Sequence, residues 1–234
     1  MKKYKLTVII PVFNEKNTIE VLLRRIFKIK GSKQIIIVDD YSTDGTRDVI
    51  KKYKNKVDKL IYHERNLGKG AAIKSAQKFV KGKYVGIQDA DLEYDPKDLE
   101  KIVYEMEKKK YDIIYGSRVL NKSMFKNTQN FTHIIRIWGN IFLTKVSNFL
   151  NGQNLTDAHT CYKVMDSRIF KKIRLKEKGF SFCPEITTKL SLMNLNIKEF
   201  PISYSGRTYE QGKKITAFDG LDALFVLAKY RFFN

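Results

Sequence analysis

The stretch YVGIQDADLEYDP contains four carboxylates within seven residues: Asp89, Asp91, Glu93 and Asp95. Carboxylates packed this closely repel one another and have raised pKa values unless a cation neutralises them. Oxygen ligands at alternate positions of a turn suit Mg²⁺ or Mn²⁺, which keeps water and ligand phosphates in its other positions. The spacing therefore predicts a divalent-cation site. Asp95 directly precedes Pro96 and is expected to cap a helix instead.

The stretch RNLGKGAA (65–72) indicates a second feature that suits an anion. Two glycines and Lys69 open a predicted helix, where backbone N–H groups and the positive end of the dipole favour negative charge. The spacing matches neither a Walker A loop nor a dinucleotide fingerprint, and a simple helix cap explains this stretch equally well. Together with the acidic turn, it favours a nucleotide diphosphate bridged to the protein by a divalent ion.

Strand and helix patterns alternate through the first half of the chain. Apolar, β-branched runs at 5–12, 34–40, 59–63, 84–88 and 111–117 predict strands, and amphipathic segments between them predict helices. This alternation is typical of an α/β fold with a mostly parallel sheet and helices on both faces. The carboxyl ends of its strands would gather residues 11–15, Asp39 and Asp40, and residues 89–93 at one edge, where such sheets bind ligands.

The second half predicts a different set of elements within the same domain. Strand patterns recur at CYKVMD and IKEFPISYS, and helix patterns at 131–150, at EITTKLSLMNL and at the carboxyl end. The helix at 131–150 is amphipathic, aromatic and basic, so it fits either a membrane interface or packing on the sheet. For Trp138 core packing is the expectation. One domain of 1–234 is predicted, with halves 1–118 and 119–215 and an amphipathic helix at 216–234.

The charge balance limits the partners. Lys and Arg number 45 against 25 acidic residues, a formal net charge of +20, which must face water or an anionic partner such as phosphate, nucleic acid or acidic lipid. The apolar run at 223–228 is too short to span a bilayer. Cys161 and Cys183 lack metal or disulfide spacing and no signal peptide is evident, which favours a reducing cytoplasm.

Five motifs in order resemble the family 2 glycosyltransferases of GT-A fold: VIIPVFNE, VDDYSTDGT, ERNLGKGAA, QDADLEYDP and GSR. Later segments, LTDAHTCYKV, FCPEIT and GRTYEQGKK, are similar to the dolichol-phosphate mannose synthase-like, polyprenyl-phosphate subgroup. The resemblance implies a GT-A (Rossmann-like) α/β fold and a nucleotide-sugar donor.

The resemblance also implies roles for individual residues. Those matching nucleotide-sugar-binding positions are Pro11, Phe13, Glu15, Asp39, Lys69, Asp89, Ala90, Asp91, Arg118, Arg207 and Lys213. Asp89, Ala90 and Asp91 match the DXD motif, and the expected ligands of Mg²⁺ or Mn²⁺ are Asp91 and Glu93. Glu93 departs from the Gln that the dolichol-phosphate enzymes usually carry. Arg118, Arg207 and Lys213 match positions that contact the donor diphosphate and the acceptor phosphate.

The implied reaction inverts the anomeric carbon, with Asp89, Arg118 and Asp157 as catalytic residues. An ionised lipid phosphate needs no strong general base, whereas a sugar hydroxyl does. Asp157 matches the family's candidate for that base, with Glu185 next, although a helix cap would use the same residue type. His159 is expected to be structural.

The function predicted is transfer of a hexose from a GDP-mannose or UDP-glucose type donor to a polyprenyl (dolichyl or undecaprenyl) phosphate. The enzyme is expected to lie on the cytoplasmic face of a membrane, held by anionic lipid. One alternative is transfer to a glycan hydroxyl during cell-surface polysaccharide synthesis. A nucleic-acid-binding protein is a remote alternative, because no binding motif is present and the acidic edge would repel a phosphate backbone.

Overall fold

The computed structural model describes residues 4–125, 131–207 and 217–233. Within these residues one sheet of seven strands runs through the molecule, in the spatial order β3-β2-β1-β4-β6-β5-β7. The strands are β1 (Leu6–Val12), β2 (Lys33–Asp39), β3 (Lys59–Tyr62), β4 (Tyr84–Ile87), β5 (Ile113–Ser117), β6 (Lys163–Asp166) and β7 (Lys198–Pro201). The predicted α/β class with a mostly parallel sheet is confirmed.

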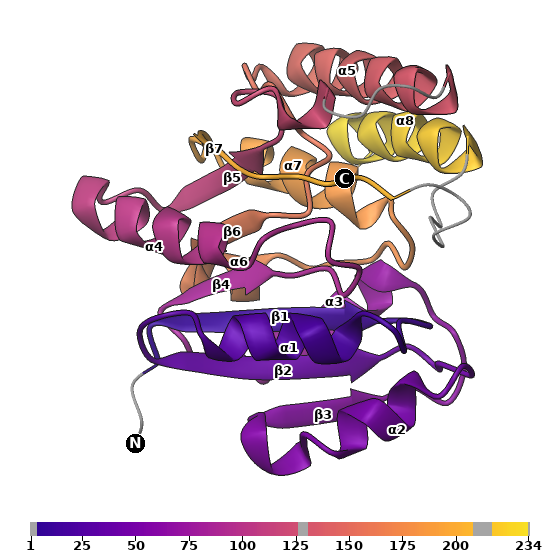
Figure 1. Cartoon of the computed structure of the whole chain (residues 1–234). Helices are drawn as coiled ribbons and strands as arrows, with labels where there is room; N and C mark the ends of the chain where they lie inside the picture. The colour runs from indigo at the N-terminus through magenta and orange to yellow at the C-terminus, as the bar shows by residue number, and fades with distance from the viewer. Residues whose placement is uncertain (1–3, 126–130, 208–216, 234) are drawn as a thin grey trace.

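Helices cover both faces of this sheet, as the alternating patterns predicted (Figure 1). On one face α1 lies next to α4, where the amide of Lys30 bonds to Glu100. On the other face α3 lies next to α6, where Gln77 bonds to the carbonyl of Phe170. The helices are α1 (Ile19–Phe27), α2 (Thr46–Lys51), α3 (Lys69–Gln77), α4 (Lys97–Lys109), α5 (Phe131–Asn151), α6 (Ser167–Lys172), α7 (Phe182–Leu192) and α8 (Ala217–Phe232).

Parallel pairing brings the carboxyl ends of β1, β2 and β4 to one edge. Strand β1 pairs with β2 up to Val12 opposite Asp39, and with β4 up to Ile9 opposite Ile87. The chain leaves all three strands in the same region, and each exit holds a non-glycine residue at positive φ: Asn14, Tyr41 and Leu92. Such conformations are costly and cluster at functional sites. This edge is therefore the first place to look for one.

Strand β6 runs antiparallel to both of its neighbours, β4 and β5. A strand was expected at CYKVMD, but its insertion between β4 and β5 was not. Because β6 runs in reverse, its amino end lies at the edge where β4 and β5 have their carboxyl ends. The segment before β6, residues 156–161, is thereby delivered to the same edge as the acidic turn. The halves 1–118 and 119–215 thus share one sheet.

Helices α5 and α8 lie side by side at one end of the molecule (Figure 1). Ile137 of α5 is buried, but Trp138 and Phe225 are each 66% exposed and Phe149 is 88% exposed. The expectation that Trp138 packs in the core was wrong, because α5 packs on α7 and α8 and turns its wide aromatic face outward. Among the described residues, no helix has the length and apolar character that crossing a bilayer requires.

Candidate active site

A cavity of about 790 Å³ opens at the carboxyl edge of the sheet. Its lining includes the predicted metal ligand Glu93 and most of the residues predicted to bind a nucleotide sugar: Pro11, Phe13, Glu15, Lys69, Asp89, Ala90, Asp91, Arg118 and Arg207. Two predicted residues do not line it, namely Asp39 and Asp157, and Lys213 lies outside the described residues. Part of the remaining lining comes from α5 and α8, which add the apolar residues Ile135, Ile137, Leu143 and Ala223 and the polar residues Arg136, Asn140 and Asp219. The cavity therefore joins an acidic turn to a wall that is partly apolar.

Lys69 and Asp89 form a close ion pair inside this cavity. Lys69 Nζ lies 2.5 Å from Asp89 Oδ1, and both side chains are largely buried. Burial alone would raise the pKa of Asp89, but the charge of Lys69 and its hydrogen bond hold that pKa below its usual value. Asp89 is consequently a fixed anion. The ammonium of Lys69 also lies over the ring of Phe182, which further limits its movement.

Asp91 and Glu93 face the same space as this ion pair. Burial and the neighbouring charges of Asp89 and Glu93 raise the pKa of Asp91 to about 7, although Arg207 opposes this. The amide of Glu93 bonds to Asp91 Oδ1 at 3.0 Å, which fixes the turn. Asp95 accepts a bond from the Lys97 amide and so caps α4, as predicted. The acidic turn thus divides into Asp89, which is paired with a lysine, and Asp91 with Glu93, which crowd each other.

Arg207 brings positive charge to these crowded carboxylates. Its guanidinium donates two bonds to Glu15, at 2.9 and 3.0 Å, and lies 3.5 Å from Asp91 Oδ2. Its backbone amide donates to Glu93 at 2.7 Å, and Tyr204 donates to the other Glu93 oxygen at 3.0 Å. A chain segment from the far end of the sequence is therefore bound directly to the acidic turn.

The residues present fit a divalent cation. Mg²⁺ does not require three ligand side chains, since it is commonly held by one or two carboxylates together with substrate phosphates. Within the described part of the chain no group of three potential ligand side chains is found. Asp91 and Glu93 supply two carboxylates, and burial with the neighbouring charges of Asp89 and Glu93 raises the pKa of Asp91, so a cation there would be favourable. They would hold the cation, with the donor's phosphates completing its ligand set.

The raised pKa of Asp91 predicts pH-dependent binding of Mn²⁺. Below pH 7 the carboxyl is protonated in the free protein and must lose its proton to bind a cation. With UDP present, we expect the Mn²⁺ affinity to fall by about tenfold per pH unit below that point and to level off above it. Titration calorimetry on either side of pH 7 measures this. An affinity that does not change with pH would contradict the assignment of Asp91 as a ligand.

The amides of the 65–72 stretch are used by the protein itself. Asp40 accepts bonds from the amides of Leu67 and Gly68, at 2.8 and 2.7 Å, and pairs with His63. The amides of Gly70 and Ala71 bond to the carbonyls of residues 179 and 178. The anion site expected at this helix start is therefore not formed by these amides, and of the stretch only Lys69 carries a charge into the cavity. The role of Asp40 was missed, because the sequence pattern reads as a turn.

Gly70 is required where α3 meets the segment before α7. A Cβ at this position would collide with the carbonyl oxygen of Glu177 and lie 2.9 Å from the Cβ of Phe182. We expect Gly70→Ala to lower the free energy of unfolding by about 1–3 kcal/mol, because backbone must move. Gly139→Ala is the control, since nothing lies within 4 Å of its added methyl. In helix α5 that change should be stabilising, by about 0.5–1 kcal/mol. Denaturant unfolding that ranks the two variants equally would refute this packing argument.

Asp39 lies at the end of β2 and does not line the cavity. Its carboxylate pairs with Arg47 at 2.6 Å and is fully buried. Arg47 itself lies over the ring of Tyr62. The predicted contact of Asp39 with the nucleoside stays a prediction, and in this structure its carboxylate is bound by Arg47.

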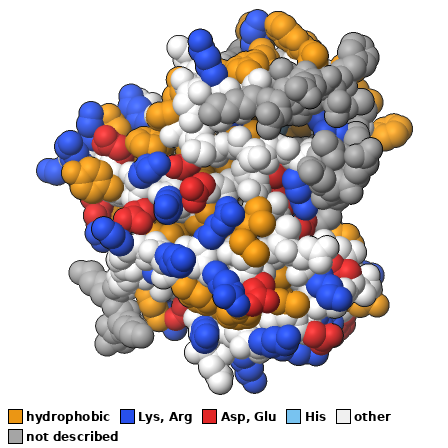
Figure 2. Space-filling view, in the orientation of Figure 1, with side chains coloured by type: hydrophobic (Ala, Val, Ile, Leu, Met, Phe, Trp, Pro, Cys, Tyr) orange, Lys and Arg blue, Asp and Glu red, His pale blue; other side chains and the backbone are white. Residues whose placement is uncertain are grey.

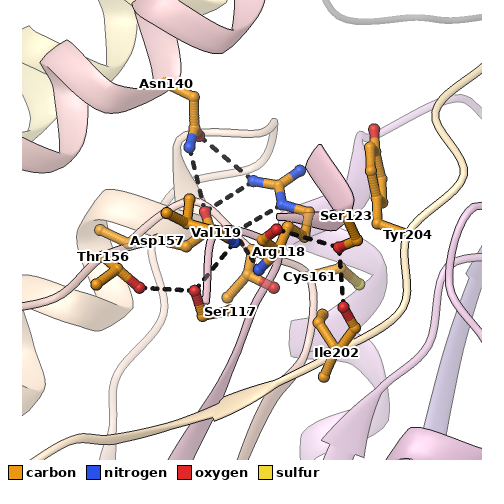
Figure 3. Close-up of polar contacts among 12 residues, drawn as sticks. Ser117, Arg118, Val119, Ser123, Asn140, Thr156, Asp157, Cys161, Ile202 and Tyr204 are labelled. Carbon is orange, nitrogen blue, oxygen red and sulfur yellow. Dashed lines mark hydrogen bonds and ion pairs between the residues drawn. The ribbon is translucent and has the colours of Figure 1, made fainter. Parts of the chain in front are cut away.

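Arg118 and Asp157 form a buried pair at the cavity wall (Figure 3). Asp157 accepts bonds from Arg118 Nε at 2.7 Å, from Nη2 at 2.8 Å and from the Arg118 amide at 3.1 Å. Asn140 of α5 also donates to Asp157, at 3.2 Å. Burial alone would raise the pKa of Asp157, but Arg118 holds that pKa below its usual value. Figure 3 shows the guanidinium between this carboxylate and the ring of Tyr204, 5.0 Å away.

This geometry bears on the two roles considered for Asp157, a general base and a helix cap. A general base must reach the proton that it removes. Both oxygens of Asp157 are occupied by Arg118 and Asn140, and its side chain is fully buried. The residue is placed to orient Arg118, and it caps no helix in the described chain. Glu185, the next base predicted, is also fully buried and bonds to the amides of residues 176 and 177.

The structural role expected of His159 stays a prediction. His159 lines the cavity, and its Nε2 atom is buried without a hydrogen-bond partner among the described residues. Burial, together with the nearby charge of Lys163, lowers the pKa of His159 to about 4, so the ring is neutral at pH 7. A neutral imidazole nitrogen in a cavity offers one hydrogen bond to a ligand.

Known glycosyltransferases are similar in sequence to this chain. A sequence model described as glycosyl transferase family 2 matches residues 7–174. An uncharacterized protein of Methanocaldococcus jannaschii is 30% identical over 100% of this chain and 95% of its own length. The UDP-N-acetylglucosamine–dolichyl-phosphate N-acetylglucosaminyltransferase of Methanococcus voltae is 26% identical over 94% of this chain and 93% of its own length.

Two further similarities concern a longer protein and a solved structure. The dodecaprenyl-phosphate galacturonate synthase of Rhizobium johnstonii is 27% identical over 79% of this chain, which spans 54% of that protein. The crystal structure of glucosyl-3-phosphoglycerate synthase from Mycobacterium tuberculosis, in complex with Mn²⁺, UDP and phosphoglyceric acid, superposes with a TM-score of 0.73. It is 14% identical and the match covers 99% of this chain and 80% of that one. That likeness confirms the predicted GT-A fold.

Proposed function

The chain belongs to glycosyl transferase family 2, and we propose that within it the protein transfers a hexose from a nucleotide-diphosphate sugar to a polyprenyl phosphate. The observation that carries the proposal is the composition of the cavity wall. Acidic and basic groups from the sheet edge line part of the cavity, and α5 and α8 add apolar side chains together with Arg136, Asn140 and Asp219. A phosphate attached to a hydrocarbon chain needs charged groups to bind the phosphate and apolar side chains to contact the hydrocarbon. The dolichyl-phosphate and dodecaprenyl-phosphate relatives support this choice of acceptor.

The donor is proposed to bind at the edge formed by β1, β2 and β4. Pro11, Phe13 and Asp39 would lie near its nucleoside, and Lys69 and Asp89 near its sugar and diphosphate. Asp91 and Glu93 would hold Mg²⁺ or Mn²⁺, which supplies positive charge against the donor's diphosphate when bound. The donors to test first are GDP-mannose and UDP-glucose.

The chemistry proposed is a single displacement with inversion. An acceptor phosphate oxygen forms a bond to the anomeric carbon while the bond from that carbon to the donor diphosphate breaks, and a nucleoside diphosphate leaves. The attacking oxygen is already ionised, so no general base is needed. This agrees with the occupied oxygens of Asp157. Arg118 and Arg207 would separate the two phosphate groups and stabilise the leaving charge, and Lys213 is proposed to join them.

The aromatic face of α5 and α8 is proposed to contact the membrane that holds the acceptor. Phe142, Phe218 and Leu221 add to its exposed apolar surface. Figure 2 shows hydrophobic side chains at the end of the molecule where α5 lies and elsewhere on this face, with Lys and Arg spread among them. Surface cations are attracted to anionic lipid, and aromatic rings enter the headgroup region. The free cysteines Cys161 and Cys183 suit the cytoplasmic side.

Liposome binding tests this surface. We expect Trp138→Glu and Phe225→Glu each to weaken binding to anionic liposomes by about tenfold or more, because burying one large apolar side chain contributes about 1.5–3 kcal/mol. Tyr104→Glu is the control, since Tyr104 is similarly exposed at 63% but lies on α4. Pelleting assays at low salt give the affinities. Equal binding by all three variants and the wild type would exclude this face as the contact.

The reaction is tested with a panel of donors, Mn²⁺ or Mg²⁺, and a short polyprenyl phosphate. We expect nucleoside diphosphate release that requires the lipid phosphate and is absent with the corresponding polyprenol. Release with a sugar acceptor but not with the lipid phosphate would favour transfer to a glycan hydroxyl instead.

A further inference from the structure

We propose that Glu199 is a positioning residue that sets the orientation of Arg118 through Thr156 and Asp157. The inference rests on the proposed function only in assigning Arg118 to the reacting phosphates. Glu199 lies within β7, opposite Tyr115 of β5, and does not line the cavity. No motif drew attention to it, since it is a single carboxylate in a short strand.

The side chain of Glu199 holds the segment before β6 by three hydrogen bonds. Oε2 accepts from the Thr156 amide at 2.8 Å and from the Thr156 hydroxyl at 3.0 Å. Oε1 accepts from the Asp157 amide at 3.0 Å. Two successive amides therefore bond to one carboxylate. This fixes the position of the Asp157 backbone relative to the sheet, because β7 is itself paired to β5.

From Asp157 the contacts lead directly to Arg118. The Asp157 carboxylate binds both the side chain and the amide of Arg118, so a displacement of Asp157 moves the whole residue. A parallel connection runs through Thr156, whose hydroxyl lies 2.6 Å from that of Ser117 (Figure 3). Ser117 Oγ in turn accepts a hydrogen bond from the amide of Val119. Glu199 thereby holds the chain on both sides of Arg118.

The consequence is larger for catalysis than for folding. Arg118 lies between Asp157 and the ring of Tyr204, and its usefulness to a reacting phosphate depends on where its guanidinium N–H groups point. A shift of about 1 Å in a positioned catalytic group can lower the rate by about 100-fold. We expect the sheet to stay intact when the Glu199 contacts are lost, because β7 pairs with β5 through backbone groups and not through this side chain.

Glu199→Gln is the substitution that isolates this role. It keeps the size of the side chain, but either orientation of the amide places an NH₂ group against a backbone N–H donor. The Thr156–Asp157 segment must then move. Glu199→Asp keeps both acceptor oxygens on a shorter side chain and should restore part of the activity. Asp58→Asn is the matched control, because Asp58 also holds a backbone amide, that of Ile35, at the opposite end of the sheet.

The test is a double-mutant cycle with Arg118→Lys. We expect Glu199→Gln to lower kcat by about 10- to 100-fold with little change in the donor KM, and to add less than about threefold in the Arg118→Lys background. Asp58→Asn should leave kcat unchanged. Effects of Glu199→Gln and Arg118→Lys that multiply, or a loss explained by a lowered Tm alone, would overturn the inference.

A second readout does not depend on the acceptor. The Arg118 Nε–H group, bonded to Asp157, should give a slowly exchanging NMR signal that is missing in Arg118→Lys and exchanges faster in Glu199→Gln. If this signal changes as expected but no lipid-dependent transfer is seen in the wild type, the positioning role stands and the proposed acceptor fails. If the signal is unaltered in Glu199→Gln, the positioning role fails whatever the acceptor.

Discussion

Replacing Asp91 by Asn is expected to abolish metal-dependent nucleotide binding and to lower kcat by about 1000-fold or more, since a bound cation contributes several kcal/mol to stabilising developing charge. The reason lies in the acidic turn. Asp89 is committed to Lys69, so the cation is assigned to Asp91 and Glu93. The amide of Asn is neutral and a weaker ligand. Without the cation, the donor's diphosphate would meet Asp89 and Glu93 with less positive charge between them.

Calorimetric titration of Mn²⁺ with UDP separates this effect from damage to the fold. Asp95→Asn is the matched control: it removes the same charge four residues later, from a side chain that caps α4. It should bind Mn²⁺ and UDP like the wild type. If Asp91→Asn binds them equally well, the cation is held elsewhere.

Arg118→Lys is expected to lower kcat by about 100- to 1000-fold, the loss typical of removing one fixed donor from a reacting oxygen. Lysine keeps the charge, but it cannot bond to Asp157 through two nitrogens and also direct a fixed N–H toward a phosphate. The Asp157 carboxylate is fully buried and would be left with fewer bonds, so the free energy of unfolding should also fall, by about 2–5 kcal/mol at most.

Steady-state kinetics with Tm measurements distinguish the two effects. Arg168→Lys is the control, because Arg168 also donates two side-chain hydrogen bonds to an aspartate, Asp166. Its side chain is 83% exposed and lies at the other end of β6. It should retain normal kcat. If Arg118→Lys retains wild-type kcat at a temperature where it is fully folded, Arg118 has no part in the chemistry.

The sequence was most informative where local pattern and position coincide. Buried strands followed by polar clusters predicted the sheet class and the edge at which Glu15, Lys69, Asp89, Asp91 and Glu93 meet. Parallel strands deliver their carboxyl ends to one edge whatever their spatial order, so this conclusion did not require the strand order to be known.

Contacts between distant segments were not predictable in the same way. The insertion of β6 between β4 and β5 depends on pairing over more than 40 residues, and only that insertion brings Asp157 to Arg118. Asp40 was expected at the ligand edge of the sheet, yet its carboxylate holds the amides of Leu67 and Gly68. In each case the contact joins segments that lie far apart in the sequence, and local pattern does not show such contacts.

The outward face of α5 was likewise undetermined. An amphipathic helix has one apolar face, and its sequence does not show whether this face packs on a neighbouring sheet or contacts a membrane. In the structure α5 packs on α7 and α8, and Trp138 lies outside that contact. The aromatic residues are therefore exposed by the packing of three helices, which the periodicity of one helix cannot show.

We propose that a lipid phosphate attacks the donor sugar in this cavity, and the structure of the reaction product tests this proposal. The protein is incubated with an α-linked nucleotide sugar, Mn²⁺ and a short polyprenyl phosphate, and the lipid fraction is analysed by mass spectrometry and by phosphorus and proton NMR. We expect a polyprenyl phosphate that carries the sugar through a β-linked phosphodiester. An α-linked product, or sugar recovered only on a glycan hydroxyl or as free sugar, would contradict it.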